Sequence, residues 1–279
     1  EETPVQMQVY VHFGFGDETD AQYSFIYEDI VTTAFKELGV DGEYRFFKNE
    51  KDFLGAVEKD SPTAVYSGGR EPVIKFITEM PYSPMWSYST YGLDEIASCI
   101  YVDEESDIED ISGLIGKSIS TNNSTFEYIL LRGVVGEPPE EFFSQVDLTK
   151  IGPSPAYSMK LEKLDAMFLS DQIFMFLERN NPGIVSTMRK LDCSFEYEFL
   201  PLMVHEGVSE KIISGMDRIL PMIANGKIRS KSTAFLKFQE FKKKNVSIED
   251  YRDIIEAYRK AEEEGWIEDY RSWMKTLEE

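Results

Sequence analysis

The chain has 279 residues, of which 42% are hydrophobic, so it is long enough for two domains with cores of their own. Its 29 basic residues stand against 51 acidic ones, and the net charge of −22 makes nucleic acids and anionic membrane surfaces poor partners. No apolar run approaches the about 20 residues that span a bilayer, and the acidic start lacks the pattern of a signal peptide, as expected of a mature or trimmed chain.

The first third of the chain alternates between strand and helix patterns. Residues 6–15 alternate in polarity and are rich in β-branched and aromatic types, which predicts a strand. The elements predicted after it are helices at residues 26–38, 49–57 and 72–80 and strands at residues 43–47 and 63–66. This order is typical of an α/β domain with a parallel sheet, where ligands gather at the carboxyl ends of strands. Those ends are residues 13–16 and 66–69.

An aromatic segment follows at residues 80–92. It is too broken by Ser and Pro for a long regular element, so we expect a loop that either lines a pocket or packs on its own core. Residues 96–102 predict another strand, and the acidic residues 103–110 predict a solvated connector. The aromatic residues of the segment are Tyr82, Trp86, Tyr88 and Tyr91.

A strand-to-helix transition lies at the centre of the chain. Residues 117–120 form a short β-type run, residues 121–125 are all Thr, Asn or Ser, and residues 126–134 have helical spacing. Ser, Thr and Asn are favoured helix N-caps because their side-chain oxygens accept the first backbone N–H groups. Such a helix start also suits a bound oxyanion. A simple helix cap remains the alternative to a ligand site.

The remaining chain predicts a second α/β unit and then helices. The unit contains strand-like residues 142–143 and 146–151, a break at Gly152-Pro153-Ser154-Pro155, a buried strand at residues 164–169 and a strand at residues 195–205. Because Pro201 lacks an N–H group, the last of these is expected to be an edge or crossing strand. The predicted helices are residues 156–164, 173–179, 209–223, 233–243, 251–261 and 266–277.

The two cysteines, Cys99 and Cys193, permit one disulfide. Each lies among strand-like residues, so two separate small buried side chains are preferred over a bridge. The chain has two His and no Cys or His pair at ligand spacing, so no metal site and no cofactor are predicted.

Three passages together resemble the type II periplasmic solute-binding proteins of ABC transporters, nearest the branch that binds sulfonates, phosphonates and thiamine-precursor pyrimidines. Residues 111–136 resemble the crossing segment, polar loop and helix of that family. Residues 146–169 resemble its passage with a Gly-Pro break and an Asp-Ala pair, here Asp165-Ala166. Residues 101–104 and 204–207 look like its paired hinge segments.

The resemblance implies an α/β fold of two lobes, each a mixed, mostly parallel sheet flanked by helices, joined by two crossing hinge segments. One lobe would hold residues 5–102 and 206–279, and the other residues 103–205. The implied role is that of a non-enzymatic, monomeric binding protein in the periplasm or elsewhere outside the cytoplasm, with or without a lipid anchor. It would close around a small organic solute and deliver it to a membrane permease.

The family's ligand contacts carry over to particular positions of this chain. The polar loop falls on Asn123, Ser124, Thr125 and Phe126, where hydroxyl and N–H groups would hold a sulfonate or phosphonate oxygen. The strand end after the Asp-Ala passage falls on Ser170 and Asp171, and an acid there would suit an amine-bearing ligand. The first lobe would supply Phe13, Gly14, Tyr66, Ser67, Gly68 and Tyr91.

Two departures leave the ligand open. Phosphonate binders of this type tend to carry a His in the break where this chain has Ser154, and Arg70 is the only cation near the first-lobe loops, with a surface role as its alternative. A flat pyrimidine-like ring held by stacking is a further possibility. The rival functions are a cofactor-biosynthesis enzyme of the same fold, which would need a Cys cluster that this chain lacks, and a ligand-sensing domain of a membrane receptor.

Overall fold

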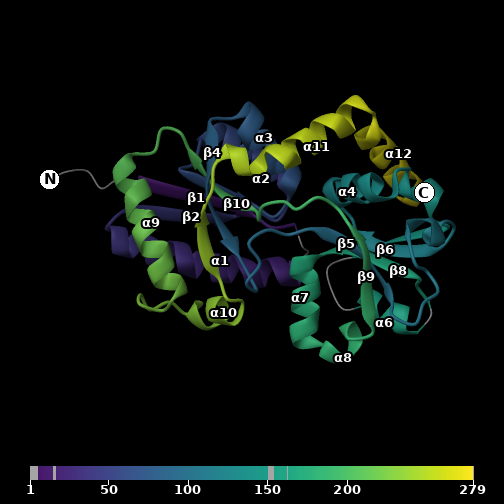
Figure 1. Cartoon of the computed structure of the whole chain (residues 1–279). Coiled ribbons are helices and arrows are strands. Elements are labelled where there is room, and N and C mark those ends of the chain that lie inside the picture. The colour runs from purple at the N-terminus through teal and green to yellow at the C-terminus, as the bar shows by residue number, and fades with distance from the viewer. Residues whose placement is uncertain (1–5, 15–16, 150–153, 162, 279) are drawn as a thin grey trace. The chain divides into compact units, whose positions relative to one another are not determined.

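The computed structural model describes residues 6–14, 17–149, 154–161 and 163–278 (Figure 1). The chain forms two compact units. Unit 1 comprises Glu1–Asp94 and Glu198–Asp250, and unit 2 comprises Glu95–Tyr197 and Tyr251–Glu279. The chain therefore passes between the units three times, after Asp94, Tyr197 and Asp250. The turn predicted at Phe15 and Gly16 and the break at Gly152 and Pro153 lie outside the described residues.

Unit 1 is built on a six-stranded mixed sheet with the strand order β11-β4-β10-β3-β1-β2. β1 pairs in parallel with both β2 and β3, as the first third of the sequence predicts, whereas β10 pairs antiparallel with β3 and β4 and β11 antiparallel with β4. The bounds are β1 Gln6–His12, β2 Asp41–Phe46, β3 Ala64–Ser67, β4 Tyr82–Ser89, β10 Pro201–His205 and β11 Lys242–Asn245.

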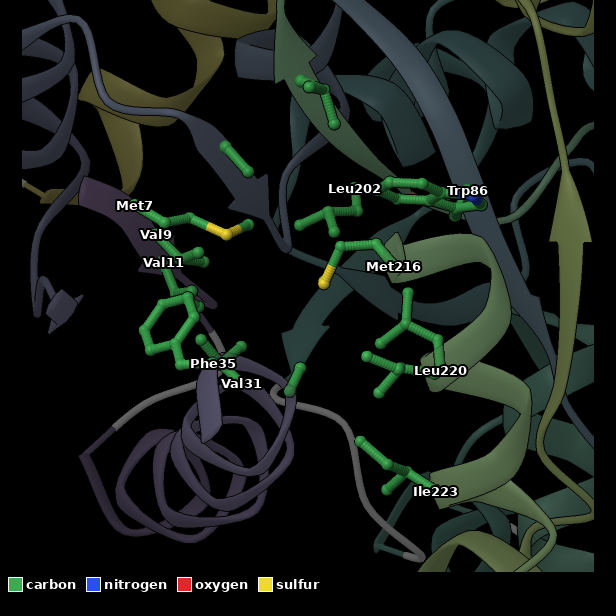
Figure 2. Packing of buried hydrophobic residues seen from close by; sticks show 14 of the residues in the cluster. Met7, Val9, Val11, Val31, Phe35, Trp86, Leu202, Met216, Leu220 and Ile223 are labelled. Atoms are coloured by element: carbon green, nitrogen blue, oxygen red, sulfur yellow. The ribbon is translucent and has the colours of Figure 1, made fainter. Parts of the chain in front are cut away.

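Helices cover both faces of this sheet because its strands bury both faces. Val9 and Val11 of β1 join one hydrophobic cluster and Tyr10 joins the other, as expected when successive side chains alternate across a strand. Figure 2 shows Val11 and Val31 on one side of the first cluster and Met216, Leu220 and Ile223 facing them from α9. The first cluster involves α1 Asp17–Leu38, α9 Glu210–Ala224 and α10 Thr233–Phe238, and the second α2 Glu50–Asp60 and α3 Arg70–Glu79.

Unit 2 contains a five-stranded sheet with the order β7-β6-β8-β5-β9. β6 pairs in parallel with β7 and β8, and β5 pairs antiparallel with β8 and β9. The strands are β5 Ser98–Asp103, β6 Ser118–Asn122, β7 Gln145–Thr149, β8 Ala166–Ser170 and β9 Met188–Cys193. The helices are η1 Ile111–Leu114, α4 Thr125–Val135, α5 Pro139–Phe142, α6 Ser154–Lys160, α7 Asp171–Asn180, α8 Pro182–Val185, α11 Arg252–Glu263 and α12 Trp266–Glu278. A short η2, Ile248–Tyr251, lies where the chain passes from unit 1 to unit 2.

Two strand predictions fail in unit 1. The aromatic segment expected to be a loop is β4, and the end of the helix expected at residues 233–243 is instead β11, which pairs with it. The strand with Pro201 is not an edge strand, because β10 lies between β3 and β4, and the predicted stretch 195–205 does cross from unit 2 to unit 1 after Tyr197. Pro201 is tolerated there because it is the first residue of the strand.

The C-terminal helices belong to unit 2 rather than to the first lobe. α12 packs on α4, where Arg132 forms an ion pair with Asp269 at 2.7 Å and lies 4.8 Å from the centre of the Trp266 ring. The passages between units also come earlier than the predicted hinge segments at residues 101–104 and 204–207, which lie within β5 and at the end of β10. The division into residues 5–102 with 206–279 and residues 103–205 therefore differs from the observed one.

Cys99 and Cys193 form a disulfide, so the preference for two separate thiols is wrong. The two residues are register partners on the antiparallel strands β5 and β9, with their Cα atoms 4.0 Å apart. Because they are 94 residues apart in sequence, the bond closes a long loop of the unfolded chain.

Replacing both cysteines with Ser is expected to lower the free energy of unfolding of unit 2 by about 2–4 kcal/mol, because the unfolded chain then regains the entropy that the loop removes. Urea unfolding with and without a thiol reductant measures the effect. The reductant should destabilise the wild type and leave the double Ser variant unchanged. If full reduction left the urea midpoint of the wild type unchanged, the assignment of the disulfide would be contradicted.

Candidate functional site

The carboxyl ends of β1 and β3 meet at one edge of the unit 1 sheet. His12 and Ser67 are register partners, and the N–H of Gly68 donates to the carbonyl oxygen of His12 at 2.8 Å. A Cβ atom on Gly68 would lie 2.0 Å from the carbonyl oxygen of Phe13, so only Gly allows the two chain segments to approach so closely. The predicted residues Phe13, Gly14, Tyr66, Ser67 and Gly68 are thus brought together.

These residues differ in what they offer a ligand. Phe13 is 2% exposed and its ring lies within 6 Å of four other rings, including Tyr27 at 5.1 Å and Tyr66 at 5.9 Å, so its role is packing. Ser67 is fully buried, and its hydroxyl accepts a hydrogen bond from the N–H of Gly69 at 3.1 Å, which shapes the turn into α3. Gly14, with a φ of +76°, is exposed.

Tyr66 is half-buried, and its hydroxyl is the side-chain polar group of this set that we consider for ligand binding. Burial raises the pKa of its hydroxyl, while a hydrogen bond with Tyr27 and the positive charge of Arg70 act in the opposite direction. The hydroxyl therefore stays protonated at neutral pH and can donate to an anion.

At the same sheet edge, Arg70 was expected from the sequence to have a surface role as its alternative, but it is buried. Its side chain is 9% exposed rather than on the surface, and it is the first residue of α3. The position directly after the Ser67-Gly68-Gly69 turn is the available sequence signal, because a cation there lies at a strand end and not on a helix face.

Tyr91 lies after β4, and its backbone is unusual. It has a φ of +58°, which is uncommon for a bulky residue, and its N–H donates to the carbonyl oxygen of Gln239 at 2.9 Å. The side chain is 7% exposed, so it is largely packed within unit 1. A backbone conformation held in this way is typical of constrained functional loops.

In unit 2, β6 leads into α4 through the predicted polar residues. Ser124 is the N-cap of α4, and its hydroxyl accepts a hydrogen bond from the N–H of Glu127 at 3.1 Å. Asn123 is exposed, and its side-chain oxygen accepts a hydrogen bond from the Tyr270 hydroxyl at 2.7 Å. Thr125 is half-buried. The cap predicted from the sequence is confirmed, and the backbone N–H groups of the first turn make this end favourable for negative charge.

Phe126, the second residue of α4, packs against aromatic rings next to this loop. It is 5% exposed, and its ring packs edge-on against Tyr197 with centroids 5.0 Å apart and parallel to Tyr258 at 5.9 Å. These ring contacts connect the start of α4 with Tyr258 of α11 and with Tyr197, the last residue of the segment Glu95–Tyr197 of unit 2. We therefore assign the side chain of Phe126 to packing. Only its backbone belongs to the α4 start that a ligand would approach.

Glu127 in the first turn of α4 is a residue that sequence reasoning missed. Its side chain is 8% exposed, and one oxygen accepts a hydrogen bond from the Ser98 hydroxyl at 3.3 Å, which in turn lies 2.8 Å from the Tyr197 hydroxyl. The signal was present, because Ser124 and Glu127 have the Ser-x-x-Glu spacing of a capping box. Its carboxyl group therefore lies in the first turn of α4, beside the proposed oxyanion position.

Ser170 and Asp171 lie at the carboxyl end of β8 and begin α7. Ser170 is 6% exposed, and its hydroxyl caps α7 by accepting from the N–H of Ile173 at 3.4 Å. Asp171 accepts a hydrogen bond from the Tyr101 hydroxyl at 3.1 Å and pairs with Lys190 at 2.9 Å. Burial, reinforced by the charge of Asp171, raises the pKa of Tyr101. Lys190 already supplies the ammonium group that an amine-bearing ligand was expected to bring.

The predicted residues thus form two sets, one at the sheet edge of unit 1 and one at strand ends of unit 2. Within the parts of the chain that the structure describes, no group of three or more His, Cys, Asp or Glu side chains could hold a metal ion. Over the same residues, no helix is both long and apolar enough to cross a bilayer.

Two mixed sheets flanked by helices, with polar residues and helix starts at their strand ends, define an α/β solute-binding protein. Residues 16–251 match the family described as the periplasmic substrate-binding protein of phosphonate ABC transporters, and this chain belongs to that family. The family is one of transport binding proteins that act outside the cytoplasm, not a family of enzymes. A search of curated proteins finds no match.

Solved structures of similar proteins have the same two-lobed type II fold. The binding-protein component of an ABC phosphonate transporter from Pseudomonas aeruginosa has a TM-score of 0.65 at 11% identity, covering 99% of this chain and 100% of that one. PhnD1 of Prochlorococcus marinus, in complex with methylphosphonate, has a TM-score of 0.64 at 16% identity, covering 93% and 99%. The aliphatic sulphonate binding protein SsuA of Escherichia coli has a TM-score of 0.58 at 13% identity, covering 94% and 88%.

Gly68→Ala is expected to lower the free energy of unfolding by about 1–3 kcal/mol, because the new methyl group would overlap the Phe13 carbonyl and force the backbone apart. Gly55→Ala in the exposed part of α2 is the matched control, since nothing lies within 4 Å of the added carbon. It should gain about 0.5–1 kcal/mol from better helix propensity. Denaturant unfolding measures both, and equal effects would refute the close approach.

Proposed function

We propose that this chain binds an organic phosphonate or sulfonate and passes it unchanged to the permease of an ABC transporter. The observation that carries the proposal is the start of α4, where Ser124 caps the helix directly after the buried strand β6. Helix starts offer hydrogen-bond donors and partial positive charge to an oxyanion. Membership of the phosphonate family supports this choice of ligand class.

Thr125 and Ser124 are the proposed side-chain donors of this set, with Asn123 as a further polar contact. A hydroxyl can accept from the helix backbone and donate to a ligand oxygen at the same time, so the cap bond of Ser124 is compatible with both roles. Local donors of this kind are needed because the protein as a whole has a net charge of −22 and repels anions at long range.

In unit 1, we propose Tyr66 and Arg70 as the polar contacts and the backbone at Gly14 and Gly68 as the part that a ligand can approach closely. Arg70 neutralises negative charge, and the Tyr66 hydroxyl remains a donor because burial keeps it protonated. Phe13 and Ser67 act through packing and turn geometry, as their burial indicates.

Glu127 influences which anions are accepted. When ionised, a buried carboxyl group in the first turn of α4 repels a dianion more strongly than a monoanion. We therefore propose that the ligand is bound with a single negative charge at this end, as a sulfonate or a singly protonated phosphonate. Asp171, already paired with Tyr101 and Lys190, is proposed to hold α7 in place beside Ser170.

The disulfide supports a location outside the cytoplasm, since such bonds persist in oxidising compartments. We propose that the protein works as a monomer, because one chain carries both sets of polar contacts. We also propose that the ligand leaves chemically intact, in keeping with a family of binding proteins.

The double substitution Ser124→Ala and Thr125→Ala is expected to weaken methylphosphonate binding at least about tenfold, because each hydroxyl would donate a hydrogen bond to a charged group. Isothermal titration calorimetry measures the affinity, and NMR of the recovered ligand shows whether it is intact. Loss of the cap should lower the free energy of unfolding by only about 1 kcal/mol.

Asp110→Ala is the control for the loss of a helix cap. Its carboxylate caps η1 by accepting from the N–H of Gly113 at 3.2 Å, and it belongs to neither set of proposed contacts. This variant should bind methylphosphonate as the wild type does. Unchanged affinity in the double variant would refute the role of the α4 start, and a chemically altered ligand would refute a pure binding function.

A further inference from the structure

The C-terminal helix α12 contacts the polar loop that precedes α4. The hydroxyl of Tyr270 in α12 donates a hydrogen bond to the side-chain oxygen of Asn123 at 2.7 Å, across 147 residues of sequence. Both residues belong to unit 2, where α12 packs on α4 (Figure 1). Since α12 carries none of the proposed ligand contacts, this bond links it to a loop that does.

The position of the Tyr270 hydroxyl is fixed by packing. The side chain is 9% exposed, and its ring lies 5.1 Å from the ring of Tyr128 in α4 and 6.3 Å from that of Trp273. The neighbouring residue Asp269 pairs with Arg132 of α4 at 2.7 Å, which holds this turn of α12 against α4. Because a tyrosine side chain has two rotatable bonds and this one is buried among its neighbours, its hydroxyl is a rigid donor.

The Asn123 side chain is exposed and gains its orientation from this partner. The backbone around it is already held, since the N–H of Ser124 donates to the carbonyl oxygen of Asn122 at 3.0 Å and Ser124 caps α4. A free carboxamide can turn either its oxygen or its NH₂ group toward a ligand. With the oxygen bound to Tyr270, the NH₂ group is the part of the amide that can donate to an oxyanion.

We infer that Tyr270 is a positioning residue of the proposed anion site, which orients the Asn123 amide so that its NH₂ group donates to the bound oxyanion. This inference rests on the proposed function and adds a residue of α12 to it. Without the Tyr270 hydroxyl, the amide could present its oxygen to the anion, which is repulsive, and its ordering would have to accompany binding. Fixing a polar side chain before the ligand arrives removes that cost.

The test is calorimetric titration of the full chain with methylphosphonate in a double-mutant cycle. Tyr270→Phe keeps the ring and should weaken binding about three- to tenfold, and Asn123→Ala about tenfold or more. In the Asn123→Ala background, Tyr270→Phe should change the affinity about onefold, because no amide is left to orient. Wild-type affinity in either single variant, or an equal loss from Tyr270→Phe in both backgrounds, overturns the inference.

Tyr128→Phe is the matched control, because it removes a hydroxyl from the same aromatic cluster. That hydroxyl donates to Glu140 at 3.2 Å and accepts from Arg132 at 3.3 Å, and it belongs to neither set of proposed contacts. The variant should bind methylphosphonate as the wild type does, and urea unfolding checks that each variant is folded. Equal losses of affinity in Tyr128→Phe and Tyr270→Phe would assign the effect to packing of α12 and overturn the inference.

NMR of the side-chain NH₂ group of Asn123 gives a readout that packing alone would not move. Its signals are identified by their loss in Asn123→Ala, and saturating methylphosphonate should shift them in the wild type. Binding without such a shift overturns the inference and leaves the proposed function intact. Absence of methylphosphonate binding by the wild type overturns the proposed function as well, so the two failures are distinguishable.

Discussion

The architecture of unit 1 depends on one buried carboxylate, that of Glu198. Its side chain is 1% exposed, and one oxygen accepts hydrogen bonds from the Ser87 hydroxyl and the Phe199 N–H, each at 2.9 Å. The other oxygen pairs with the ammonium group of Lys244, which also donates to the carbonyl oxygen of Asp94 at 3.4 Å. Asp94 and Glu198 are the residues of unit 1 at the first two passages between units, and Lys244 comes shortly before the third. A single ion pair therefore holds together the three segments by which the chain leaves and re-enters the unit.

This ion pair also helps to explain why β11 is the edge strand of the unit 1 sheet. Lys244 lies on β11, which is only four residues long and carries three consecutive lysines. Such a strand has little β propensity and few apolar side chains to bury. Its pairing with β4 is supported by Lys244 with Glu198 and by Lys243, which forms an ion pair with Asp217 of α9 at 2.7 Å. Because a buried carboxylate without its partner is costly, the edge strand and the segment after β9 stabilise each other.

The parts of the fold that the sequence predicts are those whose pattern is local. Alternation in residues 6–12 and helical spacing in residues 210–224 are visible without knowledge of neighbouring elements, and both elements are present. β4 and β11 were missed because their pairing partners are distant in sequence, since β4 pairs with both β10 and β11. The disulfide was missed for a related reason, since the approach of Cys99 and Cys193 depends on the register of β5 with β9.

The candidate site shows the same limit. Strand order and turn residues place Gly68, Ser124 and Ser170 at strand ends or helix starts, and the structure confirms those positions. Burial and pairing could not be read in advance, because they depend on groups distant in sequence. Phe13 is a core residue, Asp171 is neutralised by Lys190, and the expected surface residue Arg70 is buried.

The central claim is that this protein holds one small organic oxyanion without changing it. Native mass spectrometry of the purified chain with methylphosphonate tests this claim most directly. We predict an added mass equal to one intact ligand, which is lost when the protein is unfolded. A chain whose mass stays unchanged at saturating methylphosphonate and ethanesulfonate, or a ligand recovered with an altered mass, would contradict the account.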